Sequence, residues 1–454
     1  MGKYFGTDGI RGKVERFTPE FIGKVAKGLI DYAGNDGKRV LVGGDTRESS
    51  EWIARDFEKA FAAMGVECGN AGVLPTPGIN YAFYDMGFDL AVDITASHNP
   101  YTDNGIKVFE RGENSGVKLS AAGVEKIENA LDDINTLEPV GVEINEDLHE
   151  DALERYALHL LKYVEKFDRP EETDRAAVSL GGLQIGLDCA NGATSVVAER
   201  VFRELGAEVV VINNDANYGQ KINRDAGSTH LEQIQGLVKE RGLDFGMAFD
   251  GDGDRCLMVD AEGQIVDGDK IMAIIADFLG LKQVAATVMA NQGLFEWAKT
   301  SGVEICTTDV GDQNVAKAMR EQGIILGGEN SGHIILPGEA MGDGILTGLV
   351  VSKIVKKSGK TLAEVASVMK SFPQVVENFE AGTEAKARFN AGAGQEILDD
   401  YSARLAQNGG RLLVRPSGTE DLIRITIWGN DLAEITVVAK ELADKLKSAL
   451  EIKF

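Results

Sequence analysis

The chain is poor in cysteine and proline and has no long apolar run. With 9 prolines it contains no proline-rich linker. Its four cysteines, Cys68, Cys189, Cys256 and Cys306, lie far apart, so the sequence predicts neither a disulfide framework nor a zinc site of paired cysteines. No segment reaches the ~18 apolar residues of a membrane span, and no basic segment followed by an apolar one marks a secretory signal. We therefore expect a cytoplasmic protein that does not span a membrane.

Positive charge is also scarce, because 47 lysines and arginines stand against 72 aspartates and glutamates, a formal net charge of -25. Nucleic acids and anionic membrane surfaces are bound through accumulated Lys and Arg, so neither is an expected partner. With 454 residues the chain is long enough for about three or four domains, each with its own core.

Three segments share a pattern of a short apolar strand, a polar loop, an amphipathic helix and a second apolar strand. They comprise residues 39–74, 184–214 and 286–311. Two strands joined by a crossover helix pair in parallel, so each segment predicts an α/β unit.

The helix expected in the second segment is defined by its apolar stripe and by its end. Val196, Val197, Val201 and Leu205 recur at helical spacing, and Gly206 follows them as glycine often follows the last helical turn. A helix that includes all four apolar residues is therefore predicted.

The C-terminal part has a different order of elements, with strand candidates at 411–415 and 422–429 and a final helix over 431–453. The predicted fold class is α/β, with three similar mixed α/β domains in series followed by a C-terminal α+β domain. Polar stretches around 143–151, 249–260 and 371–379 mark the expected boundaries. The predicted domains are residues 1–148, 149–249, 250–368 and 369–454.

The stretch AFDGDGDRCL places three aspartates, Asp250, Asp252 and Asp254, directly after an apolar strand. Two carboxylates ~5 Å apart repel by roughly 3 kcal/mol at an effective dielectric of about 20, so a cation is expected among them. In an extended chain these alternate residues project to one side. A calcium hand does not fit, because Arg255 and Ala261 stand where that loop needs Gly and Glu, so Mg²⁺ is the expected ion. A solvated acidic loop is the alternative.

The segment DLAVDITASHNP runs an apolar strand into a polar loop that contains Ser97, His98 and Asn99. Loops at the carboxyl ends of parallel strands commonly carry the sites of α/β proteins. Ser97 is therefore a candidate nucleophile, although it does not lie in the G-x-S-x-G turn of serine hydrolases. Alternatively, Ser97 and Asn99 only shape a turn before Pro100.

Two basic residues lie near these loops in the sequence pattern. Lys107 is on a short apolar strand after the Ser97 loop, and Arg11 is in the glycine-rich stretch FGTDGIRG. Lys107 is a candidate catalytic residue and Arg11 a candidate phosphate ligand, with solvated surface charges as the alternative for both.

Two further polar loops predict ligand contacts. ILGGENSGHIIL carries Glu329, Ser331 and His333 between glycines, a composition suited to sugar hydroxyls, although a plain turn is the alternative. LVRPSGTEDLIR combines guanidinium groups, hydroxyls and a glycine into an expected anion-binding loop formed by Arg415, Ser417, Gly418, Thr419 and Arg424. A hydroxyl nucleophile, a metal triad, a sugar loop and an anion loop together indicate phosphoryl transfer on a phosphosugar.

Four motifs, TASHNP, DGDGDR, GGENSGH and RPSGTEDLIR, occur in this order over nearly the whole chain. With them the chain resembles the α-D-phosphohexomutase superfamily. Its opening KYFGTDGIRG and the loop GENSGH are most similar to the branch that interconverts glucosamine 6-phosphate and glucosamine 1-phosphate. It departs from that branch at VGDQN (310–314), where VGDRY is common, and at Asp421, where proline is usual.

The resemblance implies a heart-shaped, four-domain protein around a central cleft, active as a monomer or homodimer on a phosphosugar. It implies that Ser97 must be phosphorylated for activity and that one Mg²⁺ per chain is held by this phosphoserine and the three aspartates. The implied roles are a general acid/base for Lys107, contacts to the transferring group for Arg255 and Arg11, the site lining for His98 and His333, sugar-hydroxyl binding for Glu329 and Ser331, and phosphate binding for Arg415, Ser417, Gly418, Thr419 and Arg424.

Other interpretations stay open at this point. A phosphoglucomutase or phosphomannomutase of the same superfamily would share every motif and differ in its sugar. A Mg²⁺-dependent sugar phosphatase would use Ser97 and release inorganic phosphate. A metal-stabilised sugar-phosphate binding protein would bind without turnover.

Overall fold

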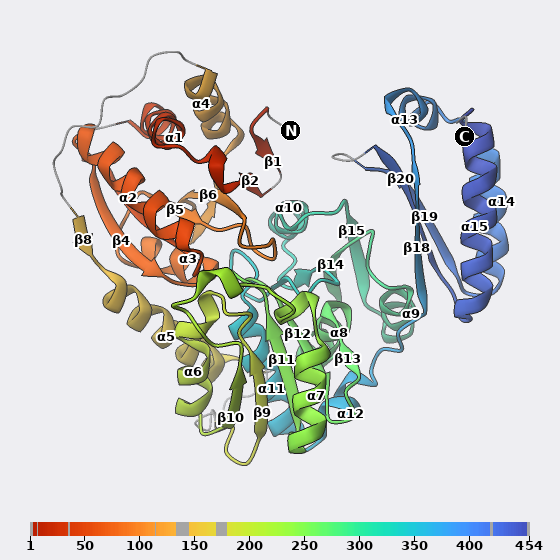
Figure 1. The fold of residues 1–454 in the computed structure, drawn as a ribbon. Helices are drawn as coiled ribbons and strands as arrows, with labels where there is room; N and C mark the ends of the chain where they lie inside the picture. Colours follow the sequence, from red (N-terminus) through yellow and green to blue (C-terminus); the bar gives the residue numbers. More distant parts are fainter. Residues whose placement is uncertain are drawn as a thin grey trace. The chain divides into compact units, whose positions relative to one another are not determined.

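The computed structural model describes residues 3–6, 8–34, 37–113, 115–132, 145–168, 179–417 and 421–451 (Figure 1). These residues form four sheets with helices packed against them, which confirms the predicted α/β class. Within the described part of the chain two compact units are found, residues 1–287 with 306–368, and residues 288–305 with 369–454. Across the same residues, no helix is both long enough and apolar enough to cross a membrane.

The first sheet carries the loop that contains Ser97. Its strands are β1 (Phe5–Gly6), β2 (Gly9–Lys13), β3 (Arg39–Gly44), β4 (Glu67–Val73), β5 (Leu90–Ile94), β6 (Asp103–Arg111), β7 (Gly116–Lys118) and β8 (Asn145–Asp147), in the order β1-β2-β6-β5-β3-β4-β8 with β7 beside β6. Strands β4 and β5 pair with β3 in parallel, and β6 pairs with β5 antiparallel. The loop after β5 therefore begins at the carboxyl edge of the parallel strands.

The helices of this part include the one predicted within residues 39–74, which joins the parallel strands β3 and β4. They are α1 (Pro19–Ala33), α2 (Glu48–Ala63), α3 (Thr76–Asp85) and α4 (Ala121–Asp132), with a short 3-10 helix at Val14–Arg16. Helix α1 begins with Thr18, whose side chain accepts a hydrogen bond from the Phe21 amide, and Pro19 occupies the first turn. Its apolar stripe is buried in the core of the first sheet.

The second sheet contains the aspartate loop between two of its strands. The strands are β9 (Gln184–Asp188), β10 (Glu208–Ile212), β11 (Phe245–Phe249), β12 (Cys256–Asp260) and β13 (Ile265–Val266), in the order β10-β9-β11-β12-β13. The helices are α5 (His149–Lys166), α6 (Ala198–Glu204) and α7 (Glu232–Arg241), with 3-10 helices at Ala193–Val196, Gly219–Lys221 and Gly227–Thr229. β12 pairs antiparallel with β11, so the sheet continues past residue 250, where the sequence divides the second domain from the third.

The predicted strand, helix and strand of the second segment are present, and β10 pairs with β9 in parallel. The helix, however, is shorter than predicted, because Val196 lies in a 3-10 helix and α6 begins only after Val197. The residues before α6 instead contact the aspartate loop, since the Ala193 amide donates to the Gly251 carbonyl at 2.8 Å. A Cβ on Gly192 would lie 2.4 Å from that carbonyl oxygen, so the close approach requires glycine.

The third sheet carries the predicted sugar loop. Its strands are β14 (Gln283–Thr287), β15 (Glu304–Thr308), β16 (Gly327–Gly328) and β17 (Ile334–Ile335), in the order β15-β14-β16-β17. Its helices are α8 (Gly268–Leu279), α10 (Asp312–Gln322), α11 (Gly344–Ser358) and α12 (Leu362–Ala366). The antiparallel pair β16 and β17 encloses residues 329–333 as its connecting loop.

The second unit has the predicted α+β composition. It contains α9 (Gln292–Ser301), β18 (Gln374–Glu380), α13 (Thr383–Asn390), α14 (Gln395–Gln407), β19 (Arg411–Pro416), β20 (Leu422–Trp428) and α15 (Leu432–Ala449), with strand order β18-β20-β19, all antiparallel. The stretch 371–379, where the sequence predicts a domain boundary, contains most of strand β18. Phe379 is the one buried residue of this strand, so most of its other positions can be polar. The apolar pattern that would predict a strand is therefore weak.

Candidate active site

Ser97 lies beside the aspartate loop, although the two are far apart in the sequence. Its Oγ donates a hydrogen bond to Asp250 Oδ2 at 2.6 Å, and the residue is almost fully buried. Its backbone φ of 52° is in the left-handed region, which is uncommon for serine and costs on the order of 1–3 kcal/mol. The surrounding contacts must therefore hold this loop in place.

Arg47 and Asn223 hold the two carbonyl groups on either side of His98. Arg47 Nη2 donates to the carbonyls of Ser97 at 3.2 Å and Asn99 at 2.5 Å, and Asn223 Nδ2 donates to the same two at 2.8 and 3.1 Å. Arg47 is fully buried and forms an ion pair with the equally buried Asp45. The Ser97 loop is thus fixed by side chains from both the first and the second sheet regions.

We expect Arg47→Met to lower the free energy of unfolding by about 3–5 kcal/mol, because it leaves the Asp45 carboxylate buried without its partner. The double variant Asp45→Asn/Arg47→Met removes both charges and should recover part of that loss. Urea titration of the purified variants measures both values.

Arg55→Met is the matched control, because Arg55 forms its ion pair with Glu51 on the exposed surface. Its free energy of unfolding should change by less than ~1 kcal/mol. An Arg47→Met protein as stable as the control would contradict the importance of the buried pair.

The three aspartates can converge on one ion. Asp250, Asp252 and Asp254 are buried, and one carboxylate oxygen from each lies within 4.8 Å of the others. Burial, and then repulsion from its two neighbours, raises the pKa of Asp250 well above its usual range. Oδ1 of Asp252 and Oδ1 of Asp254 are buried without a hydrogen-bond partner among the described residues. Three carboxylate ligands, two of which have an unsatisfied acceptor oxygen, fit a hard divalent cation such as Mg²⁺.

Glycine allows the aspartate loop to reach the Ser97 loop. A Cβ on Gly251 would lie 2.6 Å from the Ser97 carbonyl oxygen, closer than side-chain contacts allow. The alternation of aspartate and glycine therefore serves both ion binding and close packing of the two loops.

Lys107 lies on β6 with its ammonium group among the carboxylates. Its Nζ is 2.7 Å from Asp252 Oδ2, 3.4 Å from Asp254 Oδ2 and 3.5 Å from Asp8 Oδ2. Burial lowers the pKa of Lys107, but these carboxylates outweigh it and raise the pKa well above its ordinary value. The lysine is therefore charged, and its Nζ donates hydrogen bonds to Asp252 and Asp254 at the centre of the candidate site.

Arg11, Arg255 and His98 add positive and polar groups around the same loops. Arg11 and Arg255 line a cavity of about 370 Å³ together with Asp254. Burial, followed by the charges of Arg255 and Arg11, lowers the pKa of His98 to about 4. His98 Nδ1 lies 3.4 Å from Ser97 Oγ, so a neutral imidazole faces the serine.

The loop between β16 and β17 reaches this cavity as well. Glu329 and His333 line it, and the Gly311 amide donates to Glu329 Oε1 at 3.1 Å. Burial lowers the pKa of His333, but Asp254, whose Oδ2 is 3.6 Å from His333 Nδ1, outweighs it and raises the pKa. Ser331 Oγ is buried and has no hydrogen-bond partner in the described part of the chain.

Family models match consecutive parts of the chain. They are the Phosphoglucomutase/phosphomannomutase alpha/beta/alpha domains I (residues 2–138), II (161–263) and III (267–372) and the C-terminal domain (353–445). The phosphoglucosamine mutases of Acetivibrio thermocellus and Caldicellulosiruptor bescii are each 41% identical to this chain, with 99% of this chain and 100% of each relative covered. The chain belongs to the phosphoglucosamine mutase family. It is therefore an isomerase that moves a phosphoryl group within a hexose phosphate.

Solved structures share the fold of this phosphoglucosamine mutase family member. A phosphoglucomutase/phosphomannomutase family protein of Burkholderia thailandensis matches with a TM-score of 0.78 and 22% identity over 99% of this chain and 98% of its own. An N-acetylphosphoglucosamine mutase of Aspergillus fumigatus, solved with GlcNAc-6P and magnesium, matches with a TM-score of 0.64 and 18% identity over 98% and 96%. At these identities the likeness concerns the fold.

The anion loop of this phosphoglucosamine mutase family member lies in the second unit. Arg415 and Arg424 face each other in register on β19 and β20. Burial and then the charge of Arg424 lower the pKa of Arg415, which is typical of paired cations that an anion would stabilise. The Ser417 amide donates to the Leu422 carbonyl at 2.8 Å. Gly418 and Thr419 lie outside the described residues.

The two departures from the family pattern have structural consequences. Asp421 is largely exposed and its Oδ1 lies 3.3 Å from Lys386 Nζ, so part of its added negative charge is offset. Gln313 follows Asp312 at the start of α10, and Lys118 Nζ lies 2.6 Å from Asp312 Oδ2. A cation is thus present at that corner although Gln313 is neutral.

Residues that sequence reasoning missed surround the predicted set. Asp8 lies within the quoted stretch FGTDGIRG and its proximity to Arg11 could have marked it. Asp312 lies within the quoted stretch VGDQN, whereas Arg47, Asn223 and Lys118 carry no such local signal, because the groups of the site that they contact are distant in the sequence.

Proposed function

We propose that the protein interconverts glucosamine 6-phosphate and glucosamine 1-phosphate through a phosphorylated Ser97 and a bisphosphorylated sugar. The observation that carries the proposal is the 2.6 Å hydrogen bond between Ser97 Oγ and Asp250 Oδ2, within the aspartate triad. Phosphoryl transfer requires positioning and charge neutralisation more than covalent chemistry, and the triad, Lys107 and Arg255 supply both around one hydroxyl.

In the proposed reaction, phospho-Ser97 gives its phosphoryl group to the free hydroxyl of the sugar phosphate. The bond between the serine oxygen and phosphorus breaks, and a bond between the sugar oxygen and phosphorus forms. The sugar hydroxyl loses one proton and the serine oxygen gains one. We assign the relay of this proton to Lys107. The resulting bisphosphate returns its other phosphoryl group to Ser97 by the same exchange in reverse.

Other residues bind and orient the substrate in this proposal. Asp250, Asp252 and Asp254, with phospho-Ser97, would hold one Mg²⁺ per chain, which supplies charge neutralisation during transfer. We assign contacts to the transferring group to Arg255 and Arg11, the site lining to His98 and His333, sugar-hydroxyl binding to Glu329 and Ser331, and binding of the phosphate that is not transferred to Arg415, Ser417, Gly418, Thr419 and Arg424.

The proposed setting is the cytoplasm, with the enzyme a monomer or homodimer. The four cysteines support the cytoplasmic location, because each is a free thiol in the described structure and three of them are buried.

We expect the purified, phosphorylated protein to form glucosamine 1-phosphate with a kcat/KM at least ~10-fold above that for glucose or mannose 6-phosphate. A difference of that size corresponds to ~1.4 kcal/mol of transition-state binding. A coupled assay over the three sugar phosphates at saturating Mg²⁺ measures it.

Two outcomes would replace the proposal with its alternatives. Higher turnover on glucose or mannose phosphate would indicate a phosphoglucomutase or phosphomannomutase. Steady release of inorganic phosphate without a 1-phosphate product would indicate a phosphatase.

A further inference from the structure

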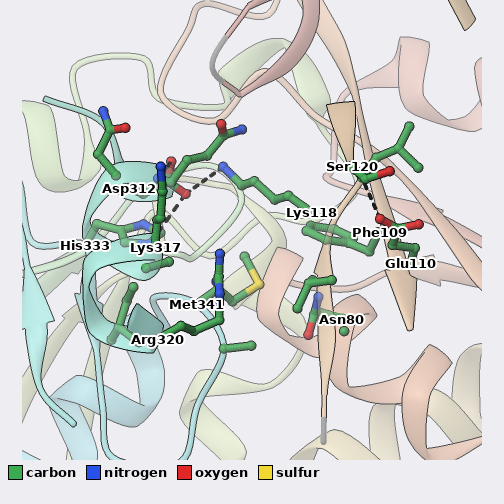
Figure 2. A pocket seen from close by; sticks show the side chains of 18 residues that line it. Asn80, Phe109, Glu110, Lys118, Ser120, Asp312, Lys317, Arg320, His333 and Met341 are labelled. Carbon is green, nitrogen blue, oxygen red and sulfur yellow. Dashed lines mark hydrogen bonds and ion pairs between the residues drawn. The ribbon is translucent and has the colours of Figure 1, made fainter. Parts of the chain in front are cut away.

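Lys118 lies between two carboxylates from different parts of the fold. It is the last residue of β7, and its Nζ is 2.6 Å from Asp8 Oδ1 and 2.6 Å from Asp312 Oδ2. Figure 2 shows its side chain reaching from β7 to the start of α10, where Asp312 and His333 lie against the same cavity of about 430 Å³. Burial lowers the pKa of Lys118, but Asp312 and then Asp8 outweigh it and raise the pKa. The ammonium group therefore bridges two carboxylates as a cation.

The first carboxylate, that of Asp8, contacts Lys107 and Arg11, two of the residues assigned to the reaction in the proposed function. Asp8 Oδ2 lies 3.5 Å from Lys107 Nζ, and Asp8 also forms an ion pair with Arg11. Burial favours the neutral form of Asp8, yet the charges of Lys107, Lys118 and Arg11 hold its pKa below the usual range. Asp8 is thus a fixed anion whose position sets two of the cations in the proposed site.

The second carboxylate leads to the sugar loop. Asp312 Oδ2 lies 3.8 Å from His333 Nε2, which itself accepts a hydrogen bond from the Gly342 amide at 3.0 Å. The residue before it, Gly311, donates its amide to Glu329 Oε1 at 3.1 Å. The start of α10 therefore lies beside both Glu329 and His333, and Asp312 lines the same cavity as these two residues.

These contacts close into a ring. His333 Nδ1 and Lys107 Nζ lie 3.6 and 3.4 Å from the same oxygen, Asp254 Oδ2. The ring runs through Lys107, Asp8, Lys118, Asp312, His333 and Asp254. Each lysine stands between carboxylates, whereas the step from Asp312 to His333 is a 3.8 Å contact and not a hydrogen bond. Removing Lys118 opens the ring and leaves Asp8 and Asp312 without the cation between them.

We propose that Lys118 is a positioning residue for the reaction: by holding Asp8 and Asp312 together, it aligns Lys107 with the sugar loop that carries Glu329 and His333. This rests on the proposed function. Lys118 acts through the two carboxylates that occupy its ammonium group. A displacement of ~1 Å in such a constellation can lower the rate ~10²-fold, so the loss of alignment is measurable.

The first test is Lys118→Met, which keeps the length of the side chain and removes the charge. We expect kcat/KM for glucosamine 6-phosphate to fall ~10- to 100-fold. The preference for glucosamine over glucose phosphate should fall with it, because Glu329 and His333 are displaced. Lys118→Arg keeps a cation and should recover most of both. Lys38→Met is the matched control, since Lys38 bonds Asp89 at 2.9 Å with similar exposure on a remote part of the first sheet.

A double-mutant cycle with Asp312→Asn separates positioning from direct substrate contact. If Lys118 acts through Asp312, the double variant is no worse than the poorer single variant. Fully multiplied losses, or a Lys118→Met enzyme that matches the wild type in rate and sugar preference, would overturn the inference. Should Lys118→Met fail to fold, Asp312→Asn alone must lower the sugar preference, and unchanged preference overturns the inference. A wild-type protein without mutase activity would instead overturn the proposed function.

Discussion

Ser97→Ala is expected to reduce mutase turnover by at least ~10³-fold, equivalent to about 4 kcal/mol of transition-state stabilisation. The substitution removes the oxygen that would carry the phosphoryl group between the two half-reactions. The remaining groups, including the triad and Lys107, can still bind and polarise a phosphate, so a residual rate is expected. The loss should appear in kcat, because the substrate contacts assigned to the sugar and anion loops stay in place.

Intact-protein mass spectrometry adds a direct measurement. The wild-type protein should carry one phosphate that Ser97→Ala lacks, after both are incubated with the same hexose bisphosphate. Ser352→Ala is the matched control, because Ser352 is a fully buried serine on α11 whose Oγ donates to the Gly348 carbonyl at 2.7 Å. Full turnover in Ser97→Ala would remove the phosphoserine mechanism.

Several residues of the candidate site that could be predicted from the sequence lie in loops that follow a strand. Ser97 comes after β5 and Asp250 after β11, and both loops are polar against apolar strands. The carboxyl ends of parallel strands lie at one edge of each sheet, where α/β proteins commonly bind ligands. The sequence pattern alone therefore predicts that such loops carry ligand-binding residues. The pairing of these two loops with each other came from the family resemblance.

The residues that could not be predicted are those whose role depends on tertiary contacts. Asn223 is 126 positions from Ser97, and Lys118 is 194 positions from Asp312. Neither lies in a motif, and a lone asparagine or lysine is usually an exposed polar residue. Only the packing of separate sheets makes them partners of the site.

The fold shows the same division between local and long-range information. Apolar periodicity predicted the strands and the helix around 411–453, which the structure contains as β19, β20 and α15. It missed β18, whose residues are mostly polar because most of its side chains are not buried. It also predicted a longer helix than α6, because the approach of Gly192 to the aspartate loop is a tertiary contact that local periodicity does not report.

Removal of Mg²⁺ is expected to lower turnover at least ~10²-fold and, independently of activity, to lower the thermal stability of the protein. The metal-free triad keeps Asp250, Asp252 and Asp254 buried within 4.8 Å of one another, and their repulsion opposes folding. Mg²⁺ binds this arrangement and not the unfolded chain, so it should raise the free energy of unfolding by about 2.7 kcal/mol at 100 times its Kd. Calorimetry after chelation, with and without added Mg²⁺, measures the shift.

Asp252→Asn tests whether the triad is the binding site. It removes one ligand charge but also the nearest counter-charge of the buried Lys107, whose Nζ lies 2.7 Å from Asp252 Oδ2, so the metal-free variant should be no more stable than the metal-free wild type. Added Mg²⁺ should no longer shift its unfolding temperature. Asp260→Asn is the control: Asp260 is at the far end of β12, where its Oδ1 accepts the Glu262 and Gln264 amides, which an asparagine oxygen can also do. That variant should keep the full Mg²⁺ shift. A Mg²⁺ shift that persists in Asp252→Asn would place the ion elsewhere and remove the triad from the mechanism.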